Sequence, residues 1–298
     1  MNTPLSILGE LNAGNFKALA RALTLVENDI EPAHQLLRNL KYDVEVPVIG
    51  ITGPPGAGKS TLINALVSIL TNQGKRIAIL AVDPTSPFNF GSLLGDRIRM
   101  AAQFNNPNVY IRSIATRGAL GGISAKTIEM VDVLRAADFD LIIIETVGVG
   151  QSEVEIAGLA DKTIVTLVPE SGDEIQHIKS GLMEIADCFV INKADREGAD
   201  IFFNKLTKLI HQGEKRIPIL KTVADKSEGV SELCDWILKS NASLNKKRTF
   251  LLTEKAWKII QHQKMQSIDK KRLQEQIQAA CNQKDFNIYR FADNWANI

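Results

Sequence analysis

GPPGAGKST, residues 53–61, narrows the choice of fold more than any other segment of the chain. It has the pattern G-x-x-x-x-G-K-S, with the apolar run VPVIGIT before it and the helix-like run TLINALVSIL after it. Glycines let backbone N–H groups converge on phosphate oxygens, and a helix N-terminus adds positive potential there. In this pattern the lysine reaches the β and γ phosphates and the serine hydroxyl binds Mg²⁺. The alternative is a glycine-rich turn that binds nothing, but the strand–loop–helix context favours a nucleoside triphosphate site. Its expected residues are Gly53, Pro54, Pro55, Gly56, Ala57, Gly58, Lys59, Ser60 and Thr61.

On both sides of this loop, short runs rich in β-branched residues alternate with helix-like segments. Strands that are apolar on both faces and are separated by helices are typical of a mostly parallel sheet. We therefore expect an α/β fold with a P-loop NTPase domain (G domain) at residues 46–240. A helical extension is expected at 1–45, and a charged, glutamine-rich helical arm at 241–298. Helices with a narrow apolar face pack on a neighbour or on a second subunit, so these flanks suggest a homodimer, with either flank as the contact. The expected strands are 46–52, 76–82, 109–114, 140–146, 162–168, 188–192 and 217–223.

The bulk composition excludes several classes of protein. With 45% hydrophobic and 23% charged residues, the 298-residue chain is typical of globular proteins. The 35 basic and 34 acidic residues give no global attraction to nucleic acid or to an anionic membrane. The cysteines Cys188, Cys234 and Cys281 are isolated, which suits a reducing compartment. The chain has no signal-like N-terminus and no apolar run that would span a bilayer, so we expect a cytoplasmic protein.

The segment INKAD, residues 191–195, ends the expected sixth strand. A carboxylate at Asp195 accepts hydrogen bonds from the ring N–H and the exocyclic amine of guanine, a pair that adenine does not offer. We expect Lys193 over the base and Asn192 as a tie to the phosphate loop. An N-K-x-D tetrapeptide alone is usually a solvated turn, but after a phosphate loop it favours GTP and GDP as ligands. The next strand exit is expected to give a backbone N–H to the guanine oxygen from Thr222, Val223 or Ala224.

The segment IIIETVGVG, residues 142–150, delivers an acid to the end of a buried strand. Glu145 is expected beside the phosphate strand, where its carboxylate would hold Mg²⁺, which prefers hard oxygen ligands and keeps several waters. Gly148 is expected to give its N–H to the γ-phosphate and to move away after hydrolysis. The alternative for Glu145 is a strand-end acid paired with a nearby lysine.

Two further acids follow the second expected strand. Asp83 stands at its C-terminal end, where α/β sheets bind ligands, and is a candidate for metal coordination or water activation. Asp96 lies at a loop–helix junction, where an aspartate is often a helix cap. In the segment 168–181, VPESGDEIQHIKSG, Gln176 and Lys179 share a helical face, and composition alone indicates a charged helix start.

Together these segments resemble the MeaB/ArgK-type GTPases, which are chaperones of the adenosylcobalamin-dependent methylmalonyl-CoA mutase. The resemblance covers nearly the whole chain, and it is carried by GPPGAGKST, AVDPTSPF…GDRIRM, IRSIATRGALGG, ETVGVGQSEVEIAGLAD, GDEIQHIK and NKAD. It implies a SIMIBI-class P-loop GTPase that hydrolyses GTP slowly until a partner stimulates it. It also implies a homodimer that gates cofactor loading or protection of the mutase.

The resemblance also implies roles for single residues. Gln176 and Lys179 lie where the family has a third switch loop, which couples to the mutase and carries residues for stimulated hydrolysis. The expected catalytic set is Lys59, Asp83, Glu145, Gln176 and Lys179, and the expected metal ligands are Ser60, Asp83, Asp96 and Glu145.

Several segments depart from the family pattern. The third switch reads PESGDEIQHIKSG where the family more usually has PGAGDELQGIKKG, and TVA stands where TSA is usual. These departures concern partner coupling more than nucleotide binding. The alternatives are a transport-linked ATPase or kinase (lysine/arginine/ornithine type), a GTPase metallochaperone for another metalloenzyme, and a binding module without hydrolysis. ATP preference would favour the first, and a His-rich tail or Cys cluster the second.

Overall fold

The computed structural model describes residues 4–30, 32–41, 46–83, 100–115, 125–146, 156–170, 182–210, 216–239, 244–266, 268–282 and 285–296. The chain divides into two compact units, Met1–Lys255 and Ala256–Ile298. In the described part of the chain, no helix has both the length and the apolar character needed to cross a bilayer.

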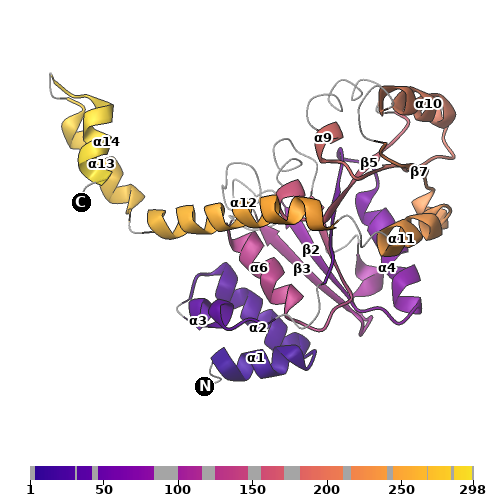
Figure 1. Ribbon diagram of the computed structural model, residues 1–298, viewed down its shortest axis with the longest axis horizontal. Helices are drawn as coiled ribbons and strands as arrows, with labels where there is room; N and C mark the ends of the chain where they lie inside the picture. Colours follow the sequence, from indigo (N-terminus) through magenta and orange to yellow (C-terminus); the bar gives the residue numbers. More distant parts are fainter. Residues whose placement is uncertain are drawn as a thin grey trace. The chain divides into compact units, whose positions relative to one another are not determined.

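The first unit is built on a seven-stranded parallel sheet with the strand order β3-β2-β4-β1-β5-β6-β7 (Figure 1). All residues of β1, β4, β5 and β6 are buried, as expected for strands covered on both faces. The predicted α/β fold and its strands are therefore confirmed. The strands are β1 (Val48–Thr52), β2 (Ile77–Asp83), β3 (Val109–Ala115), β4 (Leu141–Thr146), β5 (Lys162–Leu167), β6 (Cys188–Ile191) and β7 (Ile219–Lys221).

Helices cover both faces of this sheet because successive strand side chains point to opposite sides. Ile49 and Ile51 of β1 belong to a core cluster with residues of helices α4 and α11. Val165 and Phe189 belong to a second cluster with residues of α9 and α10. Each such buried side chain contributes roughly 1.5–3 kcal/mol. The helices are α4 (Lys59–Asn72), α9 (Met183–Ile185), α10 (Ala199–Ile210) and α11 (Val230–Lys239).

Three N-terminal helices, α1 (Pro4–Asn12), α2 (Phe16–Glu27) and α3 (Pro32–Arg38), pack together, and α2 and α3 contact α6 (Ala125–Arg135) (Figure 1). The helix α2 begins after Asn15, whose Oδ1 accepts hydrogen bonds from two backbone amides of the first turn. The helices predicted before the sheet are therefore present.

The chain ends in α12 (Leu244–Met265), α13 (Lys270–Ala280) and α14 (Ile288–Ala296). No residue of α13 is buried. Large apolar side chains are exposed on its neighbours, among them Trp257 and Tyr289, which are 59% and 78% exposed. The predicted boundaries near residues 45 and 240 stay predictions.

Candidate functional site

The loop after β1 begins at the carboxyl edge of the sheet, where β1 lies between β4 and β5. From β1 the chain passes through α4 to β2, which lies beyond β4. Open parallel sheets bind ligands in the crevice where the strand order diverges in this way. The ends of β4 and β6 bring Glu145 and Asn192 to the same edge.

Two glycines of this loop are required by close contacts, one with β5 and one with the residue that follows β6. Gly53 has a φ of 138°, and a Cβ there would lie 2.0 Å from the carbonyl oxygen of Thr166. Gly58 has a φ of 82°, and its Cβ would lie 2.4 Å from Asn192 Nδ2. Residues with side chains rarely adopt such conformations. Gly56 also has a positive φ, 78°, but a Cβ there would meet no atom within 4 Å, so only its backbone conformation favours glycine.

Lys59, the first residue of α4, is 7% exposed. Its Nζ donates hydrogen bonds to the carbonyl oxygens of Gly53 at 2.7 Å and Pro54 at 3.0 Å. The side chain therefore folds back over the start of the loop. A phosphate oxygen in the loop would exchange with these carbonyl acceptors and would gain a charge-assisted hydrogen bond.

Ser60 and Glu145 form a buried pair between α4 and β4. Ser60 Oγ donates to Glu145 Oε1 at 2.7 Å, and the two residues are 7% and 5% exposed. The parallel pairing of β1 and β4 aligns Glu145 with Ile51, one residue before the end of β1. The prediction that Glu145 lies beside the phosphate strand is confirmed.

The donor set around Ser60 and Glu145 fits Mg²⁺. A hydroxyl and a carboxylate are the hard oxygen ligands that this cation prefers, and it takes its other ligands from water and phosphate. In the part of the chain that the structure describes, no group of three or more His, Cys, Asp or Glu side chains is placed to hold a metal. Ser60 and Glu145 would supply two of the oxygen ligands of Mg²⁺.

The amide of Asn192 joins three loops at one point. Its Nδ2 donates to the carbonyl oxygen of Ala57 at 3.0 Å, in the phosphate loop. Its Oδ1 accepts from Thr222 Oγ1 at 3.1 Å and from the Ala224 amide at 3.2 Å. Asn192 is 2% exposed, and a buried amide with both ends bonded is costly to disturb. The predicted tie to the phosphate loop is confirmed.

Asp195 carries an ion pair that the sequence did not predict. Lys226 Nζ donates to Asp195 Oδ2 at 2.9 Å, and the two side chains are 54% and 41% exposed. This hydrogen bond lowers the pKa of Asp195 from its ordinary value and raises the pKa of Lys226. The carboxylate is therefore kept in its ionised form, which only accepts hydrogen bonds.

A second exposed ion pair neighbours the first. The guanidinium of Arg196 is paired with Glu170, which lies two residues beyond the buried Val168 after β5. This hydrogen bond lowers the pKa of Glu170.

Lys193 makes a second link to the phosphate loop. Its φ is 55°, and its Nζ donates a hydrogen bond to the Gly56 carbonyl oxygen at 2.8 Å.

Several predicted site residues lie outside the described part of the chain. Asp96, Gly148, Gln176 and Lys179 belong to this group, and for Asp83 only the backbone, at the end of β2, is described. Their roles stay predictions. The amides of Thr222, Val223 and Ala224 donate to Ile191 O, Glu228 O and Asn192 Oδ1, so the expected contact with a guanine oxygen also stays a prediction.

Reasoning from sequence missed Lys226 and the Thr222 hydroxyl. Lys226 follows Ala224 by two residues in a short 3-10 turn, and no periodicity or motif marks it. Thr222 is a polar residue near the end of the expected strand 217–223, and the observed β7 ends one residue before it; its place at a strand end was the available signal.

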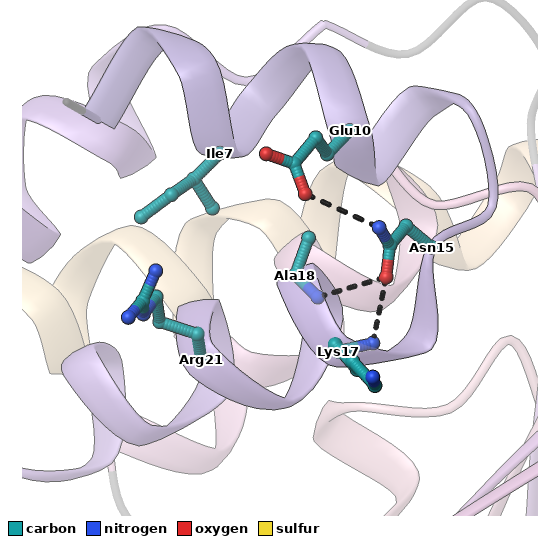
Figure 2. Close-up of a pocket in the computed structure, with 6 residues that line it drawn as sticks. All are labelled: Ile7, Glu10, Asn15, Lys17, Ala18 and Arg21. Atoms are coloured by element: carbon teal, nitrogen blue, oxygen red, sulfur yellow. Dashed lines mark hydrogen bonds between the residues drawn. The ribbon is translucent and has the colours of Figure 1, made fainter. Parts of the chain in front are cut away.

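A cavity of about 370 Å³ lies between α1 and α2. Figure 2 shows the contacts of the Asn15 side chain, which donates to Glu10 and accepts from the backbone amides of Lys17 and Ala18. These groups serve the start of α2, so the cavity is a weaker candidate than the sheet edge. Its lining residues are Ile7, Glu10, Asn15, Lys17, Ala18 and Arg21.

Comparison with known proteins gives concordant matches. The family described as "Methylmalonyl Co-A mutase-associated GTPase MeaB" matches residues 19–282. A Pyrococcus abyssi protein named as a GTPase is 42% identical, over 96% of this chain and 94% of its own length. The GTPase ArgK of Escherichia coli is 34% identical, over 94% of this chain and 86% of its own.

Among solved structures, the crystal structure of a protein named LAO/AO transport system kinase matches with a TM-score of 0.70 and 27% identity. The match covers 99% of this chain and 96% of that one. This likeness supports the P-loop fold.

Proposed function

We propose the function of this chain from its family membership. The chain belongs to the MeaB family of methylmalonyl Co-A mutase-associated GTPases. It is a P-loop GTPase, which converts GTP and water to GDP and phosphate. Our proposal is that this cycle gates cofactor loading or protection of an adenosylcobalamin-dependent methylmalonyl-CoA mutase. The client, the dimer and the residue roles below are part of the proposal.

The observation that carries the nucleotide assignment is the Asn192 amide, which fastens the base-side loops to the phosphate loop. Because of this tie, the phosphate contacts and the base contacts are held at a fixed separation. The loop backbone from Gly53 to Thr61 and Lys59 would bind the phosphates, and Asp195 would accept the two guanine donors. Adenine does not offer Asp195 this pair of donors, so the contact favours guanine.

For hydrolysis, the chain supplies position and charge. Lys59 and the loop amides would hold the γ-phosphate and stabilise negative charge that develops in the transition state. Ser60 and Glu145 would hold Mg²⁺, with Asp83 and Asp96 as the further predicted ligands, and the bound cation would neutralise charge on the phosphates. Gly148 would sense the γ-phosphate, and Gln176 and Lys179 would complete the site when the client binds. Turnover without the client would then be slow, on the order of 10⁻⁴ to 10⁻² s⁻¹.

The C-terminal helices support the proposed homodimer. Trp257, Ile260 and Met265 on α12 are each at least half exposed, and such apolar side chains on helices mark an interaction surface.

The cysteines Cys188 and Cys234 are buried free thiols, and burial raises their pKa values to about 12 and about 11. Free thiols suit the reducing cytoplasm, where we place the protein.

Two alternatives have less support. The name transport system kinase belongs to the other protein, and an ATP-dependent role here would leave Asp195 without a partner on the base. A metallochaperone for another metal would need a cargo site, and the described residues offer no His, Cys, Asp and Glu cluster for one.

The test is GTP turnover by the purified chain, alone and with purified adenosylcobalamin-dependent methylmalonyl-CoA mutase, with ATP run in parallel. We expect a slow rate with GTP only, and a rise of more than tenfold with the mutase. A rate that ignores the mutase would reject the client, and equal turnover of ATP would reject the guanine assignment. The variant Lys59→Met, assayed beside them, controls for contaminating GTPases.

A further inference from the structure

We propose that Lys226 is a positioning residue for guanine recognition, which holds the Asp195 carboxylate in the orientation that accepts both donors of the base. This inference rests on the proposed guanine site, and it adds a residue outside the motifs that identified that site. Lys226 would not touch the phosphates or the reacting atoms.

Both partners of this pair stand on fixed backbone. The Ala194 amide donates to the Thr222 carbonyl oxygen at 3.0 Å, and the Arg196 amide to that of Lys193 at 3.0 Å, so both neighbours of Asp195 are tied down. On the other side, the Lys226 amide donates to Val223 O at 3.0 Å, and Val223 bridges to Glu228. The turn is closed further on by Gly229, where a Cβ would lie 2.1 Å from the Lys221 carbonyl oxygen. The 2.9 Å contact between Lys226 Nζ and Asp195 Oδ2 therefore joins two held loops.

Without such a partner, a carboxylate that is 41% exposed is free to rotate. Guanine offers two parallel N–H donors, and both reach the carboxylate only when its plane faces the base edge. An ammonium on Oδ2 uses one of the roughly four acceptor positions of the carboxylate and fixes its plane. A fixed carboxylate plane increases the affinity for a base with two N–H donors more than the affinity for a base with one. It therefore contributes to the preference for guanine.

Arg196 provides a matched comparison. It is an exposed cation next to Asp195 in sequence, and its charge also lowers the pKa of Asp195, but its guanidinium is bonded to Glu170. The other charges that act on this pair are Asp225 and Glu228, which raise the pKa of Lys226. Removing Arg196 changes the local charge by the same amount as removing Lys226, but it leaves the bond to Asp195 in place.

The experiment compares GDP with inosine diphosphate, which lacks the exocyclic amine, and with ADP, by calorimetric titration of the full chain. The proteins are wild type, Lys226→Met, Lys226→Arg and Arg196→Gln. For Lys226→Met we expect GDP affinity to fall about three- to fivefold, with a smaller loss for inosine diphosphate. Lys226→Arg should restore the ratio, and Arg196→Gln should change it less than about twofold.

A pH series adds a readout that a merely structural role would not move. Asp195 has to be ionised to accept both donors, so GDP affinity is present above its pKa and is lost as pH falls through it. Since Lys226 lowers that pKa, Lys226→Met should move the acid limb of GDP affinity to higher pH.

Equal losses for GDP and inosine diphosphate, or equal effects of Lys226→Met and Arg196→Gln, would overturn the positioning role. Tighter GDP binding by Lys226→Met would also overturn it, because the lysine would then compete with the base. If wild type binds ADP as well as GDP, the guanine site itself fails and takes this inference with it. A guanine preference that Lys226→Met leaves intact rejects the inference alone.

Discussion

The phosphate end of the nucleotide site is built from buried contacts, and the base end carries an exposed ion pair. At the phosphate end, Lys59, Ser60 and Glu145 are each no more than 7% exposed, and their bonds are enclosed. At the base end, Asp195 and Lys226 are about half exposed, and their bond faces solvent. Breaking a buried hydrogen bond of a charged group is costly because the group stays desolvated, whereas an exposed ion pair contributes little because water screens it. We therefore expect the contacts at the phosphate end to determine whether a nucleotide binds. We expect the contacts at the base end to modulate which nucleotide binds more tightly.

The largest expected effect tests whether the phosphate end depends on close packing. In Gly53→Ala, the new methyl group would meet the Thr166 carbonyl oxygen, so we expect a loss of about 2–4 kcal/mol in the free energy of unfolding and no measurable GDP binding. Gly56→Ala is the matched control, since its φ is also positive but the space is open; about 1 kcal/mol is expected. Chemical denaturation and GDP titration measure both. Equal costs for the two variants would show that packing against β5 is not the reason for Gly53.

The next effect compares one lysine from each end. Lys59→Met should weaken GTP binding by about a hundredfold, because a buried ammonium is lost from the phosphates. Lys193→Met should cost about tenfold or less, since its stem can still cover the base. Lys75→Met, in an exposed pair with Asp140, is a control without a role in the site. Comparable losses for Lys59 and Lys193 would remove the contrast between the two ends.

A smaller effect concerns the cation. Glu145→Gln keeps the size of the side chain and its acceptor for Ser60, but it removes the charge. The tightening of GTP binding by Mg²⁺ should then fall by about tenfold. Glu129→Gln replaces another buried acid, 7% exposed and bonded to Lys126, and should leave the Mg²⁺ effect unchanged. Titration of GTP with and without Mg²⁺ distinguishes them, and an unchanged Glu145→Gln would exclude Glu145 as a ligand.

The smallest effect is expected at the exposed ion pair between Glu170 and Arg196, next to Asp195. Glu170→Gln should change GDP affinity less than about twofold, and raising the salt concentration from about 0.05 to 0.5 M should erase the difference because exposed charges are screened. Affinity measured at both salt concentrations checks this. A large, salt-independent loss would mean that Glu170 does more than pair with Arg196.

The sequence predicted the buried part of this contrast better than the exposed part. The positions of Glu145 beside β1 and of Asn192 against the phosphate loop were predicted correctly, because apolar strands and strand ends leave few arrangements for them. Lys226 was not found, because a lysine in a short turn looks the same whether it faces solvent or a carboxylate. The Glu170–Arg196 pair joins residues 26 apart in sequence, and no local pattern reports such a contact. Exposed pairs are weak, so they leave little trace in composition or periodicity.

The bond from the Ala224 amide to Asn192, which in turn holds Ala57, has a consequence for how the protein is made. On a ribosome, the phosphate loop emerges long before residues 222–224, and central β1 lacks its neighbours β4 and β5 until they follow. Domains tend to fold as units during synthesis, and contacts distant in sequence form late. During most of translation, the phosphate loop therefore lacks its hydrogen bond to Asn192. Nucleotide can stabilise the fold only when nearly the whole sheet has emerged.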